Sequence, residues 1–165
     1  MTQLTLEIKD AALRYLSSRS RTVFEMTKYL QEKGFSAEAA ALLTEEFQAL
    51  GYLDDQRYCR EYFRYGFGKG KGKKRVFYEL REKGIDPNLA EIAFEDYLAE
   101  EGTDYDERGR ALAEAEKVLR MADLTREDAL SEKVLARIGR KLQSKGYSGD
   151  IIYSVLGELR GRYTL

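Results

Sequence analysis

The stretch Leu80-Arg-Glu-Lys83-Gly84-Ile85-Asp86 decides the fold, because the chain contains two more versions of it. These are Leu30-Gln-Glu-Lys33-Gly34-Phe35-Ser36 and Leu142-Gln-Ser-Lys145-Gly146-Tyr147-Ser148. In each version the glycine suits the left-handed residue just past a helix C-terminus, and the lysine before it faces the negative end of the helix dipole. The serine or aspartate that follows can accept a hydrogen bond from the free amides of a new helix. The pattern therefore predicts three helical repeats, with the three glycines at positive φ between the second and third helices.

Apolar residues at helical spacing extend this prediction over most of the chain. A first helix is expected over residues 5–17, and Thr22 with Glu25 forms a capping-box pattern for a second. The stretch 121–130 gives only a weak signal, and no stretch alternates as a strand would. The uneven spacing of the three glycines indicates divergent internal duplication rather than a regular solenoid. The predicted fold is all-α, with three tandem three-helix repeats over residues 1–51, 52–102 and 103–165.

Composition narrows the class of protein and its compartment. Of the 165 residues, 43% are hydrophobic and 35% are charged, and no apolar run is long enough to cross a membrane. The single cysteine, Cys59, rules out an internal disulfide, and residues 1–10 lack the pattern of a secretory signal. These features predict a cytoplasmic protein without a membrane anchor.

The residue types argue against an enzyme. The chain has no histidine, so the commonest general base and metal ligand is missing, and Cys59 has no histidine to activate it. Its place on the apolar side of a predicted helix favours core packing. Asp54 and Asp55 could be paired metal ligands, but a helix N-cap followed by a first-turn acid explains them more simply. We expect no catalytic residue, no metal site and no cofactor.

The charge is strongly segregated along the chain. Residues 64–83 carry eight lysines and arginines against two glutamates, whereas residues 86–107 carry nine acids and no base. Such segregation usually concerns partners rather than the fold. We expect the acidic segment to face solvent or a basic surface of a protein partner, because acids close to a polyanion are repelled.

The basic segment includes a predicted glycine-lysine loop, Gly66–Gly72, which lacks the hydroxyl residue of a phosphate-binding P-loop. It reads either as a solvated connection or as a surface that grips a polyanion, and cation density favours the second interpretation. Tyr65, on the aromatic face of the helix predicted before this loop, and Phe67 could stack on bases, although most aromatics here are expected in the core. Arg14, Arg19 and Arg21 form a weaker cluster. The candidate DNA- or filament-binding residues are Lys69, Lys71, Lys73, Lys74, Arg75, Arg19 and Arg21.

Several of these motifs together resemble the RecX regulatory proteins. The run Arg21-Thr-Val-Phe-Glu25-Met-Thr-Lys-Tyr-Leu30 is similar to their first repeat, as is Leu50-Gly-Tyr-Leu53-Asp54-Asp55. The strongest similarity is Lys69-Gly70-Lys71-Gly72 followed by Val76, Glu79 and the Leu80–Asp86 turn, and the third repeat matches more loosely. The resemblance covers nearly the whole chain. At Lys73 it departs from the family, which often has proline there; lysine predicts a looser helix start and an added charge.

The resemblance implies an elongated, curved monomer of three tandem repeats that modulates the RecA recombinase. It implies docking in the groove of the RecA–DNA filament, suppression of RecA activities, and in some members weak, non-specific binding to single- or double-stranded DNA. Two alternatives stay open. One is a direct nucleic-acid-binding module, built from helix-turn-helix units, although no helix shows the Arg/Asn/Gln cluster of a recognition helix. The other is a helical protein-interaction scaffold unrelated to DNA.

Overall fold

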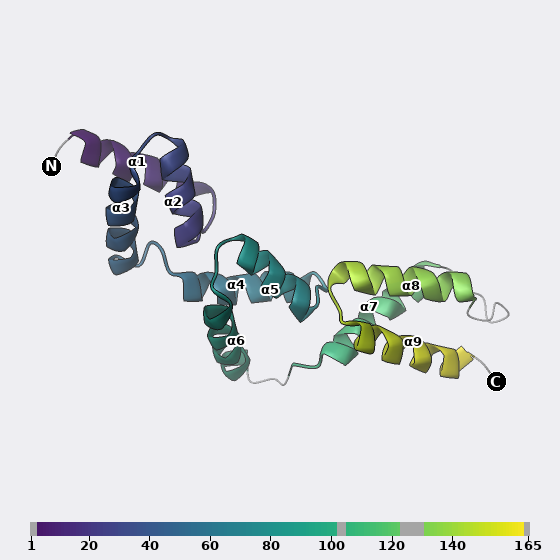
Figure 1. Cartoon of the computed structure of the whole chain (residues 1–165). Coiled ribbons are helices and arrows are strands. Elements are labelled where there is room, and N and C mark those ends of the chain that lie inside the picture. The colour runs from purple at the N-terminus through teal and green to yellow at the C-terminus, as the bar shows by residue number, and fades with distance from the viewer. Residues whose placement is uncertain (1–2, 102–104, 123–130, 164–165) are drawn as a thin grey trace. The chain divides into compact units, whose positions relative to one another are not determined.

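The protein is all-α throughout the part that the structure, a computed structural model, describes: residues 3–101, 105–122 and 131–163 (Figure 1). In chain order the helices are α1 (Gln3–Ser18), α2 (Val23–Glu32), α3 (Ala37–Ala49), α4 (Asp55–Gly68), α5 (Lys73–Glu82), α6 (Pro87–Glu101), α7 (Glu107–Met121), α8 (Glu132–Lys145) and α9 (Gly149–Tyr163). We call α1–α3, α4–α6 and α7–α9 the first, second and third repeats. None of these described helices is long and apolar enough to span a membrane.

The chain folds into two compact units. Unit 1 comprises Met1–Tyr62 and Glu79–Tyr97, and unit 2 comprises Phe63–Tyr78 and Leu98–Leu165. The helices α4, α5 and α6 contribute residues to both. The predicted boundaries of the repeats, at residues 51/52 and 102/103, stay a prediction.

The core of the first repeat lies in unit 1. Its buried side chains come from one face of each helix and from the segment after α3: Ile8, Ala12, Met26, Leu30, Ala40, Leu43, Phe47 and Leu53. Burying a large aliphatic or aromatic side chain of this kind contributes roughly 1.5–3 kcal/mol. At the edge of this core the rings of Tyr15 and Tyr29 stack with centroids 3.9 Å apart. The expected helix 5–17 is therefore confirmed and is slightly longer than predicted.

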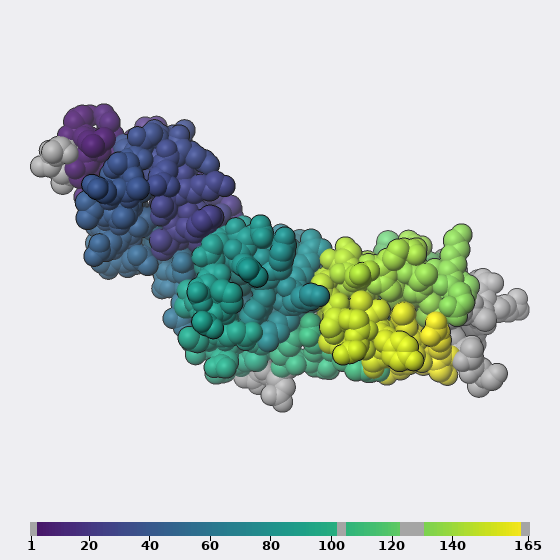
Figure 2. All heavy atoms as spheres, viewed as in Figure 1, coloured from purple at the N-terminus to yellow at the C-terminus, as the bar shows by residue number. Residues whose placement is uncertain are grey.

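The core of the third repeat lies in unit 2. Its buried residues are Ala111, Ala115, Val118, Leu135, Ile138, Leu142, Tyr147, Val155 and Leu159. The two alanines, four residues apart on α7, share one helix face and allow α8 and α9 to approach closely. The space-filling view shows α8 and α9 packed along each other (Figure 2). The weakly patterned stretch 121–130 begins with the last residue of α7, and residues 123–130 lie outside the described part.

The three Lys-Gly turns are confirmed as the connections between the second and third helices. Gly34, Gly84 and Gly146 have φ values of 96°, 82° and 91°. In each turn the residue after glycine donates its N–H to the carbonyl oxygen of the motif's leucine at 3.1 Å, which is a Schellman arrangement. The caps expected two residues after each glycine are present as well; for example, Ser36 Oγ accepts from Ala39 N–H at 3.1 Å.

The start of α2 also contacts the second Lys-Gly turn. We call this contact, which lies within unit 1, the first junction. Thr22 Oγ1, which caps α2 through Glu25 N–H, donates to the carbonyl oxygen of Lys83 at 2.7 Å. Val23, the first residue of α2, donates its N–H to Asp55 Oδ1 at 3.0 Å. The capping box of Thr22 and Glu25 is therefore confirmed, and it is joined to the next repeat.

The start of α5 contacts the third Lys-Gly turn in a similar way. We call this contact, which lies within unit 2, the second junction. Gly72 donates its N–H to the carbonyl oxygen of Lys145 at 2.7 Å. Lys73, the first residue of α5, donates its N–H to Glu107 Oε1 at 3.1 Å. A proline at this position would lack that N–H group. The expectation of a looser helix start at Lys73 is wrong, because Glu107 holds it.

Two details of α4 differ from the sequence expectations. Gly66 and Gly68 are helical, so the connection to α5 is only residues 69–72. A Cβ atom on Gly66 would lie 2.7 Å from Val76 Cγ2, so this glycine permits close packing between α4 and α5. Helical spacing predicts Tyr65 on the aromatic core face, but its side chain is 53% exposed, whereas Phe63 and Phe67 are buried. Phe63 stacks on Phe77 of α5, and Phe67 contacts Tyr105 in the segment just before α7.

Candidate polyanion interface

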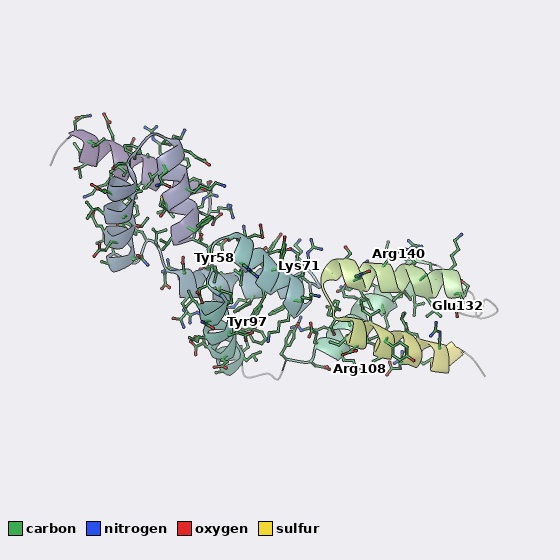
Figure 3. All side chains as sticks on the ribbon, viewed as in Figure 1. Tyr58, Lys71, Tyr97, Arg108, Glu132 and Arg140 are labelled. Atoms are coloured by element: carbon green, nitrogen blue, oxygen red, sulfur yellow. The ribbon has the colours of Figure 1, made fainter. Side chains whose placement is uncertain are left out.

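The basic candidates of the second repeat gather in unit 2, around the short connection between α4 and α5. Lys71 lies in this connection (Figure 3), and its Nζ is 5.4 Å from the ring centroid of Tyr65. Lys69 Nζ lies 6.0 Å from the same centroid. Two cations therefore flank one exposed aromatic ring, at distances at which cation–π attraction operates. Such a group offers charge for a phosphate and a ring face for a base.

The other three cations of the cluster differ in their availability. Lys74 is exposed, and no hydrogen bond or ion pair involves its side chain within the described residues. Lys73 Nζ lies 5.0 Å from the ring centroid of Phe77. Arg75 donates from Nη1 to the carbonyl oxygen of Ser144, so its guanidinium helps to fix the second junction. The five residues share one region, but Arg75 has a structural contact that the sequence does not indicate.

A further cation joins this region from the third repeat. Lys145 Nζ donates to the carbonyl oxygen of Lys69 at 2.8 Å, and Tyr147 Oη donates to that of Gly70 at 2.8 Å. The sequence identifies Lys145 only as a helix-ending lysine. Nothing in its local sequence shows that the third Lys-Gly turn contacts the basic connection, since that contact joins distant parts of the chain.

The weaker arginine cluster belongs to unit 1 and is largely engaged in local contacts. Arg21 stacks on Tyr15, with Cζ 3.8 Å from the ring centroid, and donates from Nε to the Tyr15 carbonyl oxygen at 3.2 Å. Arg19 forms an ion pair with Glu25 at 3.1 Å. Both arginines thus stabilise the connection between α1 and α2. Their role in binding stays a prediction, with less support from geometry than that of the lysines.

The acidic segment is partly neutralised inside the chain. Arg64 lies 3.2 Å from Glu101 and 4.0 Å from Glu100, and Asp96 accepts a hydrogen bond from Gln56 at 2.6 Å. Glu107 caps α5. These contacts show that several acids of the segment have roles in the fold, in addition to any that they have toward a partner.

The residues considered for chemistry have structural roles. Asp54 caps α4 by accepting from Arg57 N–H at 3.1 Å, as expected. Cys59 is fully buried, as its predicted core position requires, and burial raises the pKa of its thiol to about 12. A thiol with so high a pKa is a poor nucleophile. Within the described ranges, no group of three or more carboxylate or cysteine side chains could hold a metal ion.

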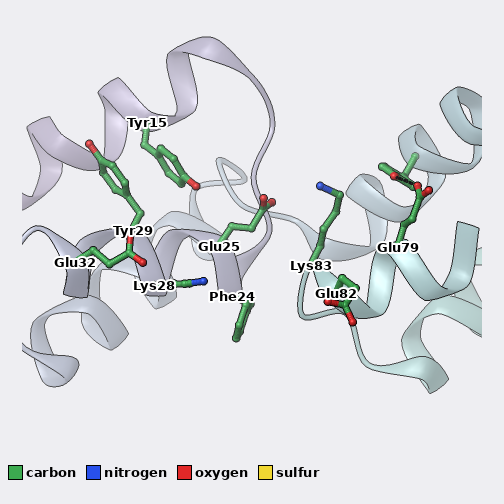
Figure 4. Close-up of a pocket in the computed structure, with 10 residues that line it drawn as sticks. Tyr15, Phe24, Glu25, Lys28, Tyr29, Glu32, Glu79, Glu82 and Lys83 are labelled. Atoms are coloured by element: carbon green, nitrogen blue, oxygen red, sulfur yellow. Dashed lines mark hydrogen bonds between the residues drawn. The ribbon is translucent and has the colours of Figure 1, made fainter.

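Unit 1 contains a pocket of 510 Å³ between the α1–α2 pair and α5. Figure 4 shows Tyr15, Glu25 and Lys28 on one side and Glu79 and Lys83 on the other. Four glutamates and two lysines line it, so the lining carries both signs of charge with an excess of acid.

Comparisons with known proteins agree with this architecture. Residues 9–42 match the model of the first three-helix domain of RecX, and residues 54–93 match that of the second. The chain is 31% identical to the regulatory protein RecX of Legionella pneumophila, over 94% of this chain and 97% of that protein. The chain belongs to the RecX family of regulatory proteins.

Other RecX proteins define the extent of the similarity. The chain is 32% identical to the regulatory protein RecX of Lactobacillus delbrueckii over 95% of its own length, but it spans only 55% of that longer relative. The crystal structure of RecX from Lactobacillus salivarius superposes with a TM-score of 0.73 at 28% identity, covering 94% of this chain and 96% of that one. The helical repeat fold of RecX is thus shared along nearly the whole chain.

Proposed function

We propose that this protein docks on the filament that RecA forms on DNA and lowers RecA activity, and so regulates recombinational DNA repair in the cytoplasm. The observation that carries the proposal is the similarity to a regulatory protein RecX over 94% of this chain and 97% of that relative. Since nearly all of both chains aligns, the similarity involves all three repeats of this chain rather than one shared module.

The proposed regulation is by binding, without catalysis. The sequence has no histidine, and the single thiol is buried with a pKa raised to about 12. A monomer can act in this way if it occupies a surface that RecA needs for DNA exchange or ATP turnover. The three repeats, divided at residues 51/52 and 102/103, would then contact successive protomers of the filament.

We assign the contact with DNA to Tyr65, Lys69, Lys71 and Lys74. The support is the exposed Tyr65 ring with two lysines beside it, together with the exposed Lys74 on the first turn of α5. Lysines that neutralise phosphates give binding that is independent of base sequence and weakens with salt.

The same observation favours a second candidate function, direct binding to single-stranded nucleic acid. An exposed aromatic ring among cations is the usual stacking platform for unpaired bases. In that case RecA would be unnecessary, and the affinity for bare DNA would equal the affinity for a filament.

Sedimentation of RecA filaments formed on single-stranded DNA tests the proposal. We expect the protein to pellet with filaments at concentrations that leave it free when only DNA is present. Equal affinity for bare DNA and filaments, with a steep fall in salt, would support the second candidate instead. Failure to pellet with filaments at any concentration would contradict the proposed function.

A further inference from the structure

The third helices of the first two repeats expose an aliphatic side chain at the same position. Leu42 of α3 is 69% exposed and Ile92 of α6 is 53% exposed, and both belong to unit 1. Each is the sixth residue after the cap that precedes its helix, Ser36 or Asp86. The two helices correspond on their buried faces as well, because equivalent positions there are also buried in both, for example Phe47 and Tyr97.

An exposed glutamate accompanies each aliphatic residue. Glu45 and Glu95 lie three residues further along their helices, and side chains with this spacing share a helix face. Within the part of the chain that the structure describes, neither glutamate forms an ion pair or a hydrogen bond through its side chain. The two glutamates therefore hold no other part of the fold through a polar contact of their side chains.

The neighbouring acids behave differently. Glu46 forms an ion pair with Lys9 at 3.0 Å, and Asp96, at the corresponding position of α6, accepts from Gln56 at 2.6 Å. At the tenth position after each cap the acid thus contacts another part of the fold, whereas the acid before it is exposed on the same face as an exposed aliphatic side chain. The same division in two diverged repeats indicates a shared external contact.

The third repeat lacks this feature. The sixth residue after its cap Ser148 is Ser154, whose Oγ accepts from Arg108 Nε of α7 at 2.8 Å. This position is therefore occupied by a contact within unit 2, and only the first two repeats carry the exposed pair.

We propose that Leu42–Glu45 and Ile92–Glu95 are two equivalent docking points for a protein surface that itself repeats. At each point the partner would offer an apolar side chain beside a basic one. The glutamates exclude a phosphate backbone as the occupant, since like charges repel. The inference rests on the proposed function, in which the repeating surface is the protein coat of the RecA filament.

The test uses the full chain with Leu42→Ser and Ile92→Ser together, and RecA filaments on single-stranded DNA as the probe. Truncating two apolar contacts should weaken filament binding about tenfold or more, because a few residues carry most of the binding energy of an interface. Binding to bare single-stranded DNA should not change. The matched control is Tyr153→Ser, which removes a 79% exposed side chain from α9, outside the repeated position. Both variants should unfold at the same temperature as the wild type.

A second variant, with Glu45→Lys and Glu95→Lys, tests the charge. It should slow association with filaments at low salt, because interfacial charges mainly steer encounter. Equal filament binding by the wild type and the serine variant would overturn this inference alone. A wild-type protein that does not bind filaments would overturn the proposed function and this inference together.

Discussion

The first and second junctions use the same backbone frame with different side chains. In both, an acid at the first position of one helix accepts the first N–H of an earlier helix: Asp55 from Val23, and Glu107 from Lys73. In both, the lysine carbonyl of a Lys-Gly turn accepts a second hydrogen bond. Its donor is the hydroxyl of Thr22 in one junction and a backbone N–H in the other.

The residues that cover the two turns differ more. At the first junction Phe24 lies over Gly84, and at the second Arg75 lies over Gly146. The second junction also brings Lys145 to the carbonyl oxygen of Lys69. The comparison separates a hydrogen-bond frame, which both junctions share, from the side chains around it, which at the second junction include the cations Arg75 and Lys145. The predictions below test this separation through the free energy of unfolding, from the largest expected change to the smallest.

The largest effect is expected from the glycines that the junctions cover. A Cβ atom at Gly146 would lie 2.1 Å from Arg75 Cβ, and one at Gly84 would lie 2.2 Å from Phe24 Cβ, whereas the space at Gly34 is open. Left-handed backbone strain costs about 1–2 kcal/mol at all three. Overpacking adds about 1–3 kcal/mol at Gly84 and Gly146. Urea unfolding of the three Gly→Ala variants should rank Gly34 as the mildest, and equal losses would contradict the role of the junctions.

The next effect concerns the acids of the frame. Asp55→Ala and Glu107→Ala each remove the acceptor of a helix-starting N–H, which should cost about 1–3 kcal/mol. The control is Glu45→Ala, which removes an exposed acid that lies outside both junctions. The stability of the three variants is compared by the denaturant concentration at the midpoint of unfolding. A junction variant as stable as the control would show that water replaces the carboxylate without cost.

A smaller effect is expected in the pH dependence of the stability that Asp55 contributes. Burial raises the pKa of the Asp55 carboxyl above its usual 3.8 and outweighs the opposing hydrogen bond from Val23 N–H. The folded state therefore holds this proton more strongly than the unfolded state, so this contribution to stability falls as pH rises through the window just above 3.8. Relative to Asp55→Asn, the wild type should lose stability over that window. A constant difference would contradict the raised pKa.

The smallest change in stability, near zero, is expected from the cations around Tyr65. Replacing Lys69, Lys71 and Lys74 by alanine removes the exposed charges of Lys69 and Lys74 and that of the partly buried lysine between them. Charges at a protein surface contribute little to folding. Binding should nevertheless weaken, and the slope of log K against log salt should fall by about 0.7 for each lost phosphate contact on single-stranded DNA. Alanine at Lys133, Arg137 and Arg140 of α8 is the matched control. An unchanged slope in the first variant would make the connection a linker only.

The turns and caps could be predicted from sequence because their geometry depends on neighbours along the chain. The positive φ of Gly84 and the capping box at Thr22 follow from residues within one helical turn. The junction contacts could not, since Gly72 meets the carbonyl oxygen of Lys145 from a distant part of the chain. The exposure of Tyr65 could not be predicted from the sequence for the same reason. Helical periodicity places it near the core face, but packing between α4 and α5 selects Phe63 and Phe67.

The candidate interface was predictable only as a concentration of charge. Five cations in residues 69–75 identify the region, but the sequence does not separate Arg75, which donates to Ser144, from the exposed Lys74. It also does not show that two lysines flank one exposed ring. These distinctions depend on side-chain packing, which composition and spacing do not specify.

RecA-catalysed ATP hydrolysis on single-stranded DNA, measured while this protein is added, tests the central claim most directly. We predict that the hydrolysis rate falls as the protein is added and levels off when the filament sites are filled. The variant with alanine at Lys69, Lys71 and Lys74 should need more protein for the same decrease. A hydrolysis rate that stays constant up to saturating protein would contradict the proposal that this RecX-family chain regulates RecA.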